Sequence, residues 1–198
     1  RLETAAMGAI AQVSPAAYNA TGVGHVRYPV EALAFGAVAE NASAALQGGR
    51  NLLSGFQPDG HIYYVPPATG TDYSKTQWSK EANGLTASSV VAVLEAAVFS
   101  GDRTLTTEAL RLLRAMDTFK NTVPRGAQTW EVPLHTPDIL ASAYLVRAYV
   151  LGYELTGEAY FLEQARYWAW TGVPFVYLVP PTPQPVGVYS TIPVLGAT

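Results

Sequence analysis

The chain has 198 residues, of which 49% are hydrophobic and 14% charged, and its formal net charge is -3. So much apolar surface excludes a disordered chain and requires a substantial core, for which this length suffices as a single domain, residues 1–198. The weak negative charge and the lack of any dense run of Lys or Arg argue against nucleic acid as a partner.

The compartment and any membrane association are only partly constrained. The chain has no cysteine, which excludes disulfides and thiolate metal sites but leaves the compartment open, with a periplasmic or secreted bacterial protein slightly favoured. No stretch reaches the roughly 18 to 20 consecutive apolar residues of a bilayer-spanning helix, so we expect no membrane span. Because the chain begins with Arg1 rather than Met, we expect it to be processed or excised from a longer chain.

The spacing of apolar residues predicts three pairs of helices. The first pair covers residues 2–13 and 29–54, and Gly48-Gly49 is expected to break or bend its second helix. In the second pair, residues 86–100 are apolar on most sides, which predicts a buried helix. Gly101-Asp102 then makes a tight break, and residues 103–120 alternate apolar with charged positions, as in an amphipathic helix.

The third pair repeats the second. Thr136 is expected to cap a buried helix at residues 137–156, with Asp138 at its positive end, and an amphipathic helix at residues 158–171 follows. Aligning Gly101 with Gly157 shifts the chain by 56 residues. The same shift pairs Ala87 with Ala143, Val90 with Val146, Ala109 with Ala165, and Phe119 with Phe175. A repeated helical hairpin is the simplest interpretation.

Long linkers rich in Pro, Gly and aromatic residues follow the second helix of each pair, at residues 55–84, 121–135 and 173–198. Since only short breaks separate the two helices of a pair, the long linkers should share one end of the molecule. Residues 60–65 and 129–134 could form short strands within them. The predicted fold class is therefore all-α, an array of about three antiparallel helical hairpins with long loops at one end.

Several segments resemble the α/α toroid of six-hairpin glycosidase-like proteins. They are residues 130–138, which read Trp-Glu-Val-Pro-Leu-His-Thr-Pro-Asp and enter a buried helix, the turn Pro58-Asp59-Gly60-His61, and the breaks at Gly101 and Gly157. Members of that family close a ring of about six hairpins. The resemblance therefore implies part of a larger or open toroid, with further hairpins from another segment or chain.

The resemblance also implies a cleft where the inner helices begin, in which acidic residues act on a glycosidic bond or a uronate. Carbohydrate is then the expected partner. The residues expected to contact it are aromatic or imidazole side chains of the long loops: Trp78, Trp130, Tyr63, Tyr64, Tyr73, Tyr177 and His135.

Glu131 is the first candidate for catalysis. Its apolar neighbours Trp130 and Val132 would raise its pKa through partial burial and let it donate a proton. The alternative is a loop carboxylate that only accepts hydrogen bonds. Asp138 could supply the second carboxylate that a glycoside hydrolase needs, or it could simply stabilise a helix end.

Asp59 and His61 form a second candidate group. Asp59-Gly60 is a strong turn signal, yet the adjacent imidazole could share proton transfer with this carboxylate. The alternative is that the histidines are solvent-facing and have no role. Glu81 would either join the cleft or pair with Lys80 in solvent.

No cofactor is predicted. His25, His61 and His135 lie far apart and none has a ligand partner at i, i+4, so we expect no transition metal, and no dinucleotide fingerprint occurs. The leading hypothesis is a glycoside hydrolase acting on an oligo- or polysaccharide by carboxylate general acid/base chemistry. The alternatives are a non-catalytic module that binds a glycan or a protein, and a uronate lyase with His61 or His135 as its base.

Overall fold

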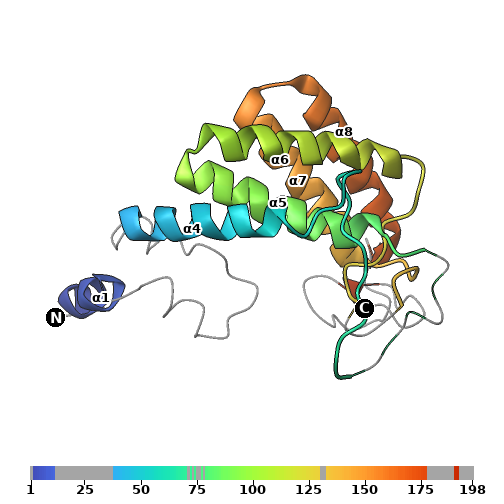
Figure 1. Ribbon diagram of the computed structural model, residues 1–198, viewed down its shortest axis with the longest axis horizontal. Coiled ribbons are helices and arrows are strands. Elements are labelled where there is room, and N and C mark those ends of the chain that lie inside the picture. The colour runs from blue at the N-terminus through green and yellow to red at the C-terminus, as the bar shows by residue number, and fades with distance from the viewer. Residues whose placement is uncertain are drawn as a thin grey trace.

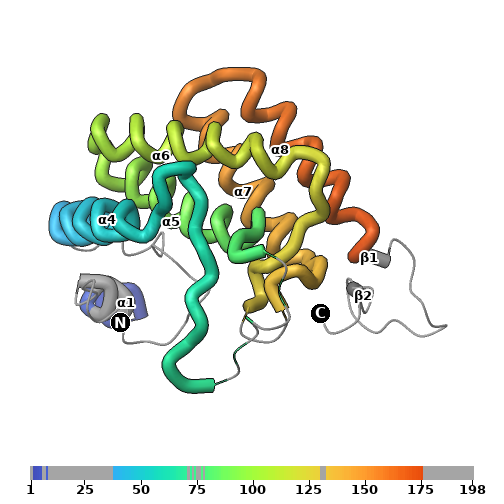
Figure 2. Tube along the Cα trace, turned by 45° about the vertical axis from the view of Figure 1, so that its right-hand side comes forward, coloured from blue at the N-terminus to red at the C-terminus, as the bar shows by residue number. Residues whose placement is uncertain are grey.

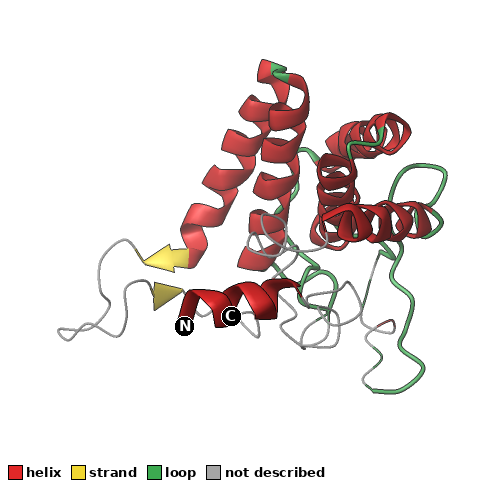
Figure 3. Ribbon diagram, turned by 90° about the vertical axis from the view of Figure 1, so that its left-hand side faces the viewer, coloured by secondary structure: helices red, strands yellow, loops and turns green. Residues whose placement is uncertain are grey.

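The protein is all-α, as the sequence predicts (Figures 1 and 3). The computed structural model describes residues 2–11, 38–70, 72, 74, 77, 79–129, 133–177 and 190–191. Its α-helices are α1 (Leu2–Ala11), α4 (Val38–Leu53), α5 (Asn83–Ser100), α6 (Arg103–Ala115), α7 (Ile139–Thr156) and α8 (Ala159–Gly172). Two 3-10 helices, η2 (Met116–Phe119) and η3 (Val173–Phe175), follow α6 and α8. The strands β1 (Val176–Tyr177) and β2 (Ser190–Thr191) pair antiparallel over two residues each.

Helix α5 is the centre of the packed part of the molecule (Figure 2). It contacts α4, α6 and α7, and α7 in turn packs against α8. These contacts bury its aliphatic side chains together with those of α6, α7 and α8 in one hydrophobic core. By length and composition alone α5 could cross a membrane, with a mean hydropathy of 1.3 over 18 residues. Its central position explains that composition, because a helix covered on several sides is apolar on several sides.

The hairpin repeat is confirmed by the helix boundaries. Helices α5 and α7 both have 18 residues, and the start and end of α7 lie 56 residues after those of α5. Each ends at a glycine in the left-handed conformation, Gly101 with φ 65° and Gly157 with φ 70°, and a second helix begins two residues later. The two 3-10 helices also correspond, since η2 ends at Phe119 and η3 at Phe175. Two hairpins, α5/α6 and α7/α8, therefore share one local design.

Two expectations about helix α4 and the start of α7 are wrong in detail. Helix α4 runs through Gly48-Gly49 without a break. A Cβ at Gly49 would lie 2.8 Å from both Ala96 Cβ and Leu105 Cδ2, so this glycine allows α4 to approach α5 and α6 closely. Helix α7 begins at Ile139, and its N-cap is Asp138, not Thr136, because the Asp138 side chain accepts a hydrogen bond from the backbone N–H of Ala141.

The first two long linkers meet at the start of α5, at the lower right of Figure 1. Asn83 makes the junction: its Nδ2 donates to Val123 O (2.7 Å), and its Oδ1 accepts from Arg125 N (2.9 Å). The expected shared end is thus present for these two linkers, while most of residues 173–198 lie outside the described part. The expected strand at residues 60–65 is reduced to one antiparallel bridge between Tyr63 and Glu81.

Candidate functional site

A tight turn at Asp59-Gly60 directs His61 into the protein. Gly60 has φ +87°, and a Cβ there would lie 2.7 Å from Ala115 Cβ, so a side chain would meet both backbone strain and a clash. Asp59 Oδ1 accepts a hydrogen bond from the backbone N–H of His61 (2.9 Å), which is an Asx turn. The sequence signal for a turn at this position is confirmed.

His61 is held on its inner side by η2. Its ring is buried and stacks on Phe119, with the ring centroids 4.4 Å apart. Its Nε2 lies 2.8 Å from Thr118 Oγ1, while the Thr118 hydroxyl donates its hydrogen to Ala115 O (2.9 Å). Because a threonine hydroxyl has one hydrogen, Thr118 must accept from His61, and Nε2 must carry the donated proton. This hydrogen count leaves Nδ1 as the nitrogen that faces the remaining partners.

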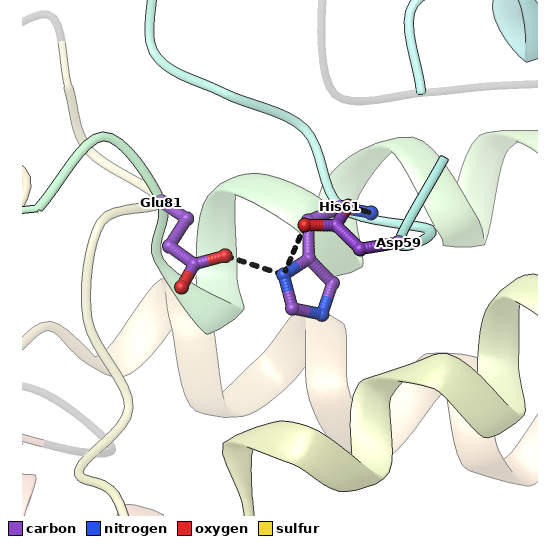
Figure 4. A group of neighbouring side chains, drawn as sticks. All are labelled: Asp59, His61 and Glu81. Atoms are coloured by element: carbon purple, nitrogen blue, oxygen red, sulfur yellow. Dashed lines mark hydrogen bonds and ion pairs between the residues drawn. The ribbon is translucent and has the colours of Figure 1, made fainter. Parts of the chain in front are cut away.

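The end of the first long linker, residues 55–84, places Glu81 against that nitrogen. The bridge between Tyr63 and Glu81 and the hydrogen bond from Tyr64 N to Lys80 O (2.6 Å) run residues 63–64 antiparallel to residues 80–81. As a result a Glu81 carboxylate oxygen contacts His61 Nδ1, and Asp59 Oδ2 lies 3.7 Å from the same nitrogen (Figure 4). Glu81 therefore pairs with His61, in agreement with the first of its two expected arrangements and not with a pair to Lys80 in solvent.

We call Asp59, His61 and Glu81 the His61 cluster. One oxygen of each carboxylate and one ring nitrogen all lie within 4.8 Å of one another. The imidazole is 6% exposed, whereas the side chains of Asp59 and Glu81 are 43% and 36% exposed. The cluster thus combines a fixed, buried ring with two carboxylates that solvent can reach.

Neighbouring donors keep Asp59 ionised. The backbone N–H of His61 is the main cause that lowers the pKa of Asp59, and the Tyr63 hydroxyl, which donates to Asp59 Oδ2 at 3.0 Å, lowers it further. The same hydrogen bond raises the pKa of Tyr63, because ionisation of the phenol would place two negative charges together. Arg125 adds a positive charge near Glu81 and donates to the Glu81 carbonyl oxygen (3.2 Å).

The other predicted site residues in the described part lie outside the cluster. Asp138 is fully buried at the N-cap of α7, where its two oxygens accept from Ala141 N (2.7 Å) and Ala127 N (3.0 Å). Its side chain thus serves the helix start and the preceding loop. His135 lies half-buried in the loop before α7, and Tyr64 is half-buried beside Lys80.

Four predicted site residues lie outside the described residues: Trp78, Tyr73, Trp130 and Glu131. Their proposed roles stay predictions. Glu81 is the cluster member that the sequence placed in the cleft only as one of two alternatives, because it is 20 residues from His61 and reaches it through the bridge to Tyr63. A spacing search limited to histidine pairs also misses a group in which carboxylates surround a single imidazole.

Comparison with known proteins adds no information on identity. No protein-family model, curated protein or solved structure matches the chain.

Proposed function

We propose that the protein is a carbohydrate-active enzyme, a glycoside hydrolase that works by carboxylate acid/base chemistry at the His61 cluster. The observation that carries the proposal is the convergence of Asp59 and Glu81, from two parts of a long linker, on one imidazole. The cluster also lies beside the start of α5, the end of the hairpins at which the resemblance to six-hairpin proteins implies a cleft.

The two carboxyl groups suit different roles in such a reaction. Hydrolysis of a glycosidic bond needs one carboxyl that protonates the leaving oxygen and a second that acts as nucleophile or general base. Asp59 suits the ionised role, since both of its oxygens accept hydrogen bonds, from His61 N and from the Tyr63 hydroxyl. Glu81 suits the proton-donating role, because His61 Nδ1 contacts it and can exchange a proton with it.

Tyr63 adds a surface for a sugar. Its side chain is 37% exposed while its hydroxyl is anchored on Asp59, so the ring is fixed next to the carboxylates. An aromatic ring that is both exposed and fixed can pack against the apolar face of a sugar at small entropic cost. The substrate class that fits these neighbours best is therefore a neutral oligo- or polysaccharide.

The array of hairpins also supports the proposal of a toroid. A groove of about 650 Å³ runs along α7 and α8, lined by residues that include Ser142, Val146 and Val150. A shift of 56 residues maps these three positions onto Thr86, Val90 and Leu94 of α5, which are fully buried. The groove on the α7/α8 hairpin thus corresponds to a surface that neighbouring elements cover in the α5/α6 hairpin. In a toroid a further hairpin of the same pattern would cover it.

A substrate screen with matched variants tests the proposed activity. Wild-type protein is incubated with a panel of neutral and uronate-containing oligosaccharides, and released reducing ends are measured. Asp59→Asn and Glu81→Gln should each lower kcat at least about a hundredfold, a loss in the range of general acid/base contributions, with little change in Tm because both side chains are partly exposed. Glu108→Gln on α6, which removes an exposed pair with Arg111, is the control and should retain full activity.

The same screen separates the other candidate functions. Activity that is lost in Glu131→Gln but kept in both cluster variants would move the reaction away from the His61 cluster. Products that absorb in the ultraviolet through a new double bond would indicate a lyase. Binding of a glycan without any turnover would identify a binding module and overturn the proposed hydrolase.

A further inference from the structure

We propose that the His61 cluster is also a binding site for a divalent transition-metal cation, with Zn²⁺ as the ion that fits it best. The ligand atoms would be His61 Nδ1, Asp59 Oδ2 and one carboxylate oxygen of Glu81, which already lie within 4.8 Å of one another. The sequence predicts no metal, so this inference comes from the tertiary arrangement alone.

The spacing of His61 Nδ1 and Asp59 Oδ2 is close to what a shared ion needs. Zinc binds nitrogen and carboxylate oxygen at about 2.0 to 2.2 Å, so two ligands at a tetrahedral angle lie roughly 3.4 Å apart. His61 Nδ1 and Asp59 Oδ2 are separated by 3.7 Å. Asp59 therefore needs a shift of only a few tenths of an ångström. Glu81, which is in direct hydrogen-bond contact with Nδ1, would have to move back by about 1 Å to reach the same spacing. Both side chains are partly exposed, so neither shift requires repacking of the core.

The surroundings of His61 provide the support that metal-bound histidines have. A ligating imidazole commonly donates its second N–H to a fixed acceptor, which sets the tautomer and the direction of the lone pair. Here Nε2–H donates to Thr118 Oγ1, Thr118 is itself oriented by Ala115 O, and the ring plane is held by Phe119. Nδ1 therefore faces the two carboxylates, and a metal ion bound there would displace the proton that Nδ1 and Glu81 share in the metal-free protein.

The donor set indicates the class of cation. Two carboxylates neutralise a 2+ charge, and an imidazole nitrogen favours zinc-like ions over Mg²⁺ and Ca²⁺, which prefer oxygen ligands. With three protein ligands, a tetrahedral ion keeps one position for water or a substrate atom. Because the side chains of Asp59 and Glu81 are partly exposed, solvent or a substrate could reach that fourth coordination position. Arg125 is the nearby positive charge that opposes binding, and its side chain is fixed on two carbonyl oxygens.

Cation binding and the proposed hydrolysis use the same carboxylate oxygens. A bound Zn²⁺ would remove Asp59 and Glu81 from acid/base work, so the ion would inhibit the reaction. This consequence alone rests on the proposed function. Binding itself is measured without substrate.

Calorimetric titration tests the site on the intact chain. Protein freed of metal with a chelator is titrated with ZnCl₂, and separately with MgCl₂ and CaCl₂. We expect one saturable Zn²⁺ site per chain, and at least tenfold weaker binding of the other two ions. Asp59→Asn and Glu81→Gln should each weaken Zn²⁺ binding at least tenfold, whereas Glu108→Gln should bind as the wild type does.

Thr118→Val distinguishes a built site from a chance group of acids. This nearly isosteric change leaves all three ligands in place and removes only the acceptor that fixes the His61 tautomer, so affinity should fall roughly 10- to 100-fold. Zinc binding that is unaffected by Asp59→Asn, Glu81→Gln and Thr118→Val, or the absence of a saturable site, would overturn the inference. Hydrolysis without zinc binding would leave the proposed function intact, and zinc binding without hydrolysis would leave only the metal site.

Discussion

Gly101 and Gly157 hold the same place in two successive hairpins: each donates its N–H to the carbonyl oxygen four residues earlier, Ala97 for Gly101 and Tyr153 for Gly157. Both adopt positive φ, and a Cβ at either position would meet no atom within 4 Å. We therefore expect Gly101→Ala and Gly157→Ala to cost similar amounts, about 1 kcal/mol each, from backbone strain alone. Urea denaturation measures both. A cost at one site and none at the other would contradict the equivalence of the two turns.

Gly48 and Gly49 in α4 should respond to alanine with opposite signs. A Cβ at Gly48 meets no atom within 4 Å, so Gly48→Ala should stabilise the protein by roughly 0.5 to 1 kcal/mol through helix propensity. At Gly49 the Cβ would approach Ala96 and Leu105, so Gly49→Ala should destabilise by about 1 to 3 kcal/mol. The neighbouring glycine is the control for helix propensity. Equal effects on the free energy of unfolding would show that α4 does not pack on α5 as described.

Val90 and Val146 occupy equivalent positions in the repeat, but their side chains differ in burial. Val90 is fully buried, whereas Val146 lines the groove along α7 and α8. Val90→Ala should cost about 2 kcal/mol through lost burial and a cavity, and Val146→Ala less than about 1 kcal/mol in this chain. Chemical denaturation of both variants is the measurement. If Val146→Ala costs as much as Val90→Ala, the groove is covered within the chain itself.

Asp138 should make the stability depend on pH in an unusual direction. Burial raises its pKa in the folded protein, against the lowering effect of the backbone N–H groups of Ala127 and Ala141. The folded protein then keeps a proton that the unfolded chain, near the ordinary value of 3.8, has already lost. The contribution of Asp138 to the free energy of unfolding therefore decreases as the pH rises from that value through the raised pKa.

Asp138→Asn isolates this contribution. The amide keeps one acceptor oxygen and loses the other, so one of the N–H groups of Ala127 and Ala141 is left without its acceptor and stability should fall by about 1 to 2 kcal/mol. The advantage of the wild type over the variant should be greater near pH 4 than near pH 7, measured by urea denaturation at each pH. An advantage that grows with pH would show that the carboxylate is stabilised, not penalised, by its surroundings.

The hairpin repeat could be predicted from sequence because its determinants are local. A buried helix is recognised by its continuous apolar surface, its end by Gly101 or Gly157, and the next helix by periodic charges, all within about 30 residues of chain. The shift of 56 residues then recovers the boundaries of both hairpins to within a few residues. Position Asp138 shows the limit of this approach, since Thr136 and Asp138 are both good caps by residue type.

The sequence by itself therefore determined the α5/α6 and α7/α8 hairpins and the end of the molecule at which the first two long linkers meet. Only the tertiary structure decided that Glu81 and Thr118, 20 and 57 residues from His61, meet its two ring nitrogens. The physical reason is that the direction of a side chain in a loop depends on how that loop packs against segments that are distant in the sequence. The bridge at Tyr63, the turn at Gly60 and the packing of Phe119 together fix the ring, and of these only the turn could be predicted from the sequence.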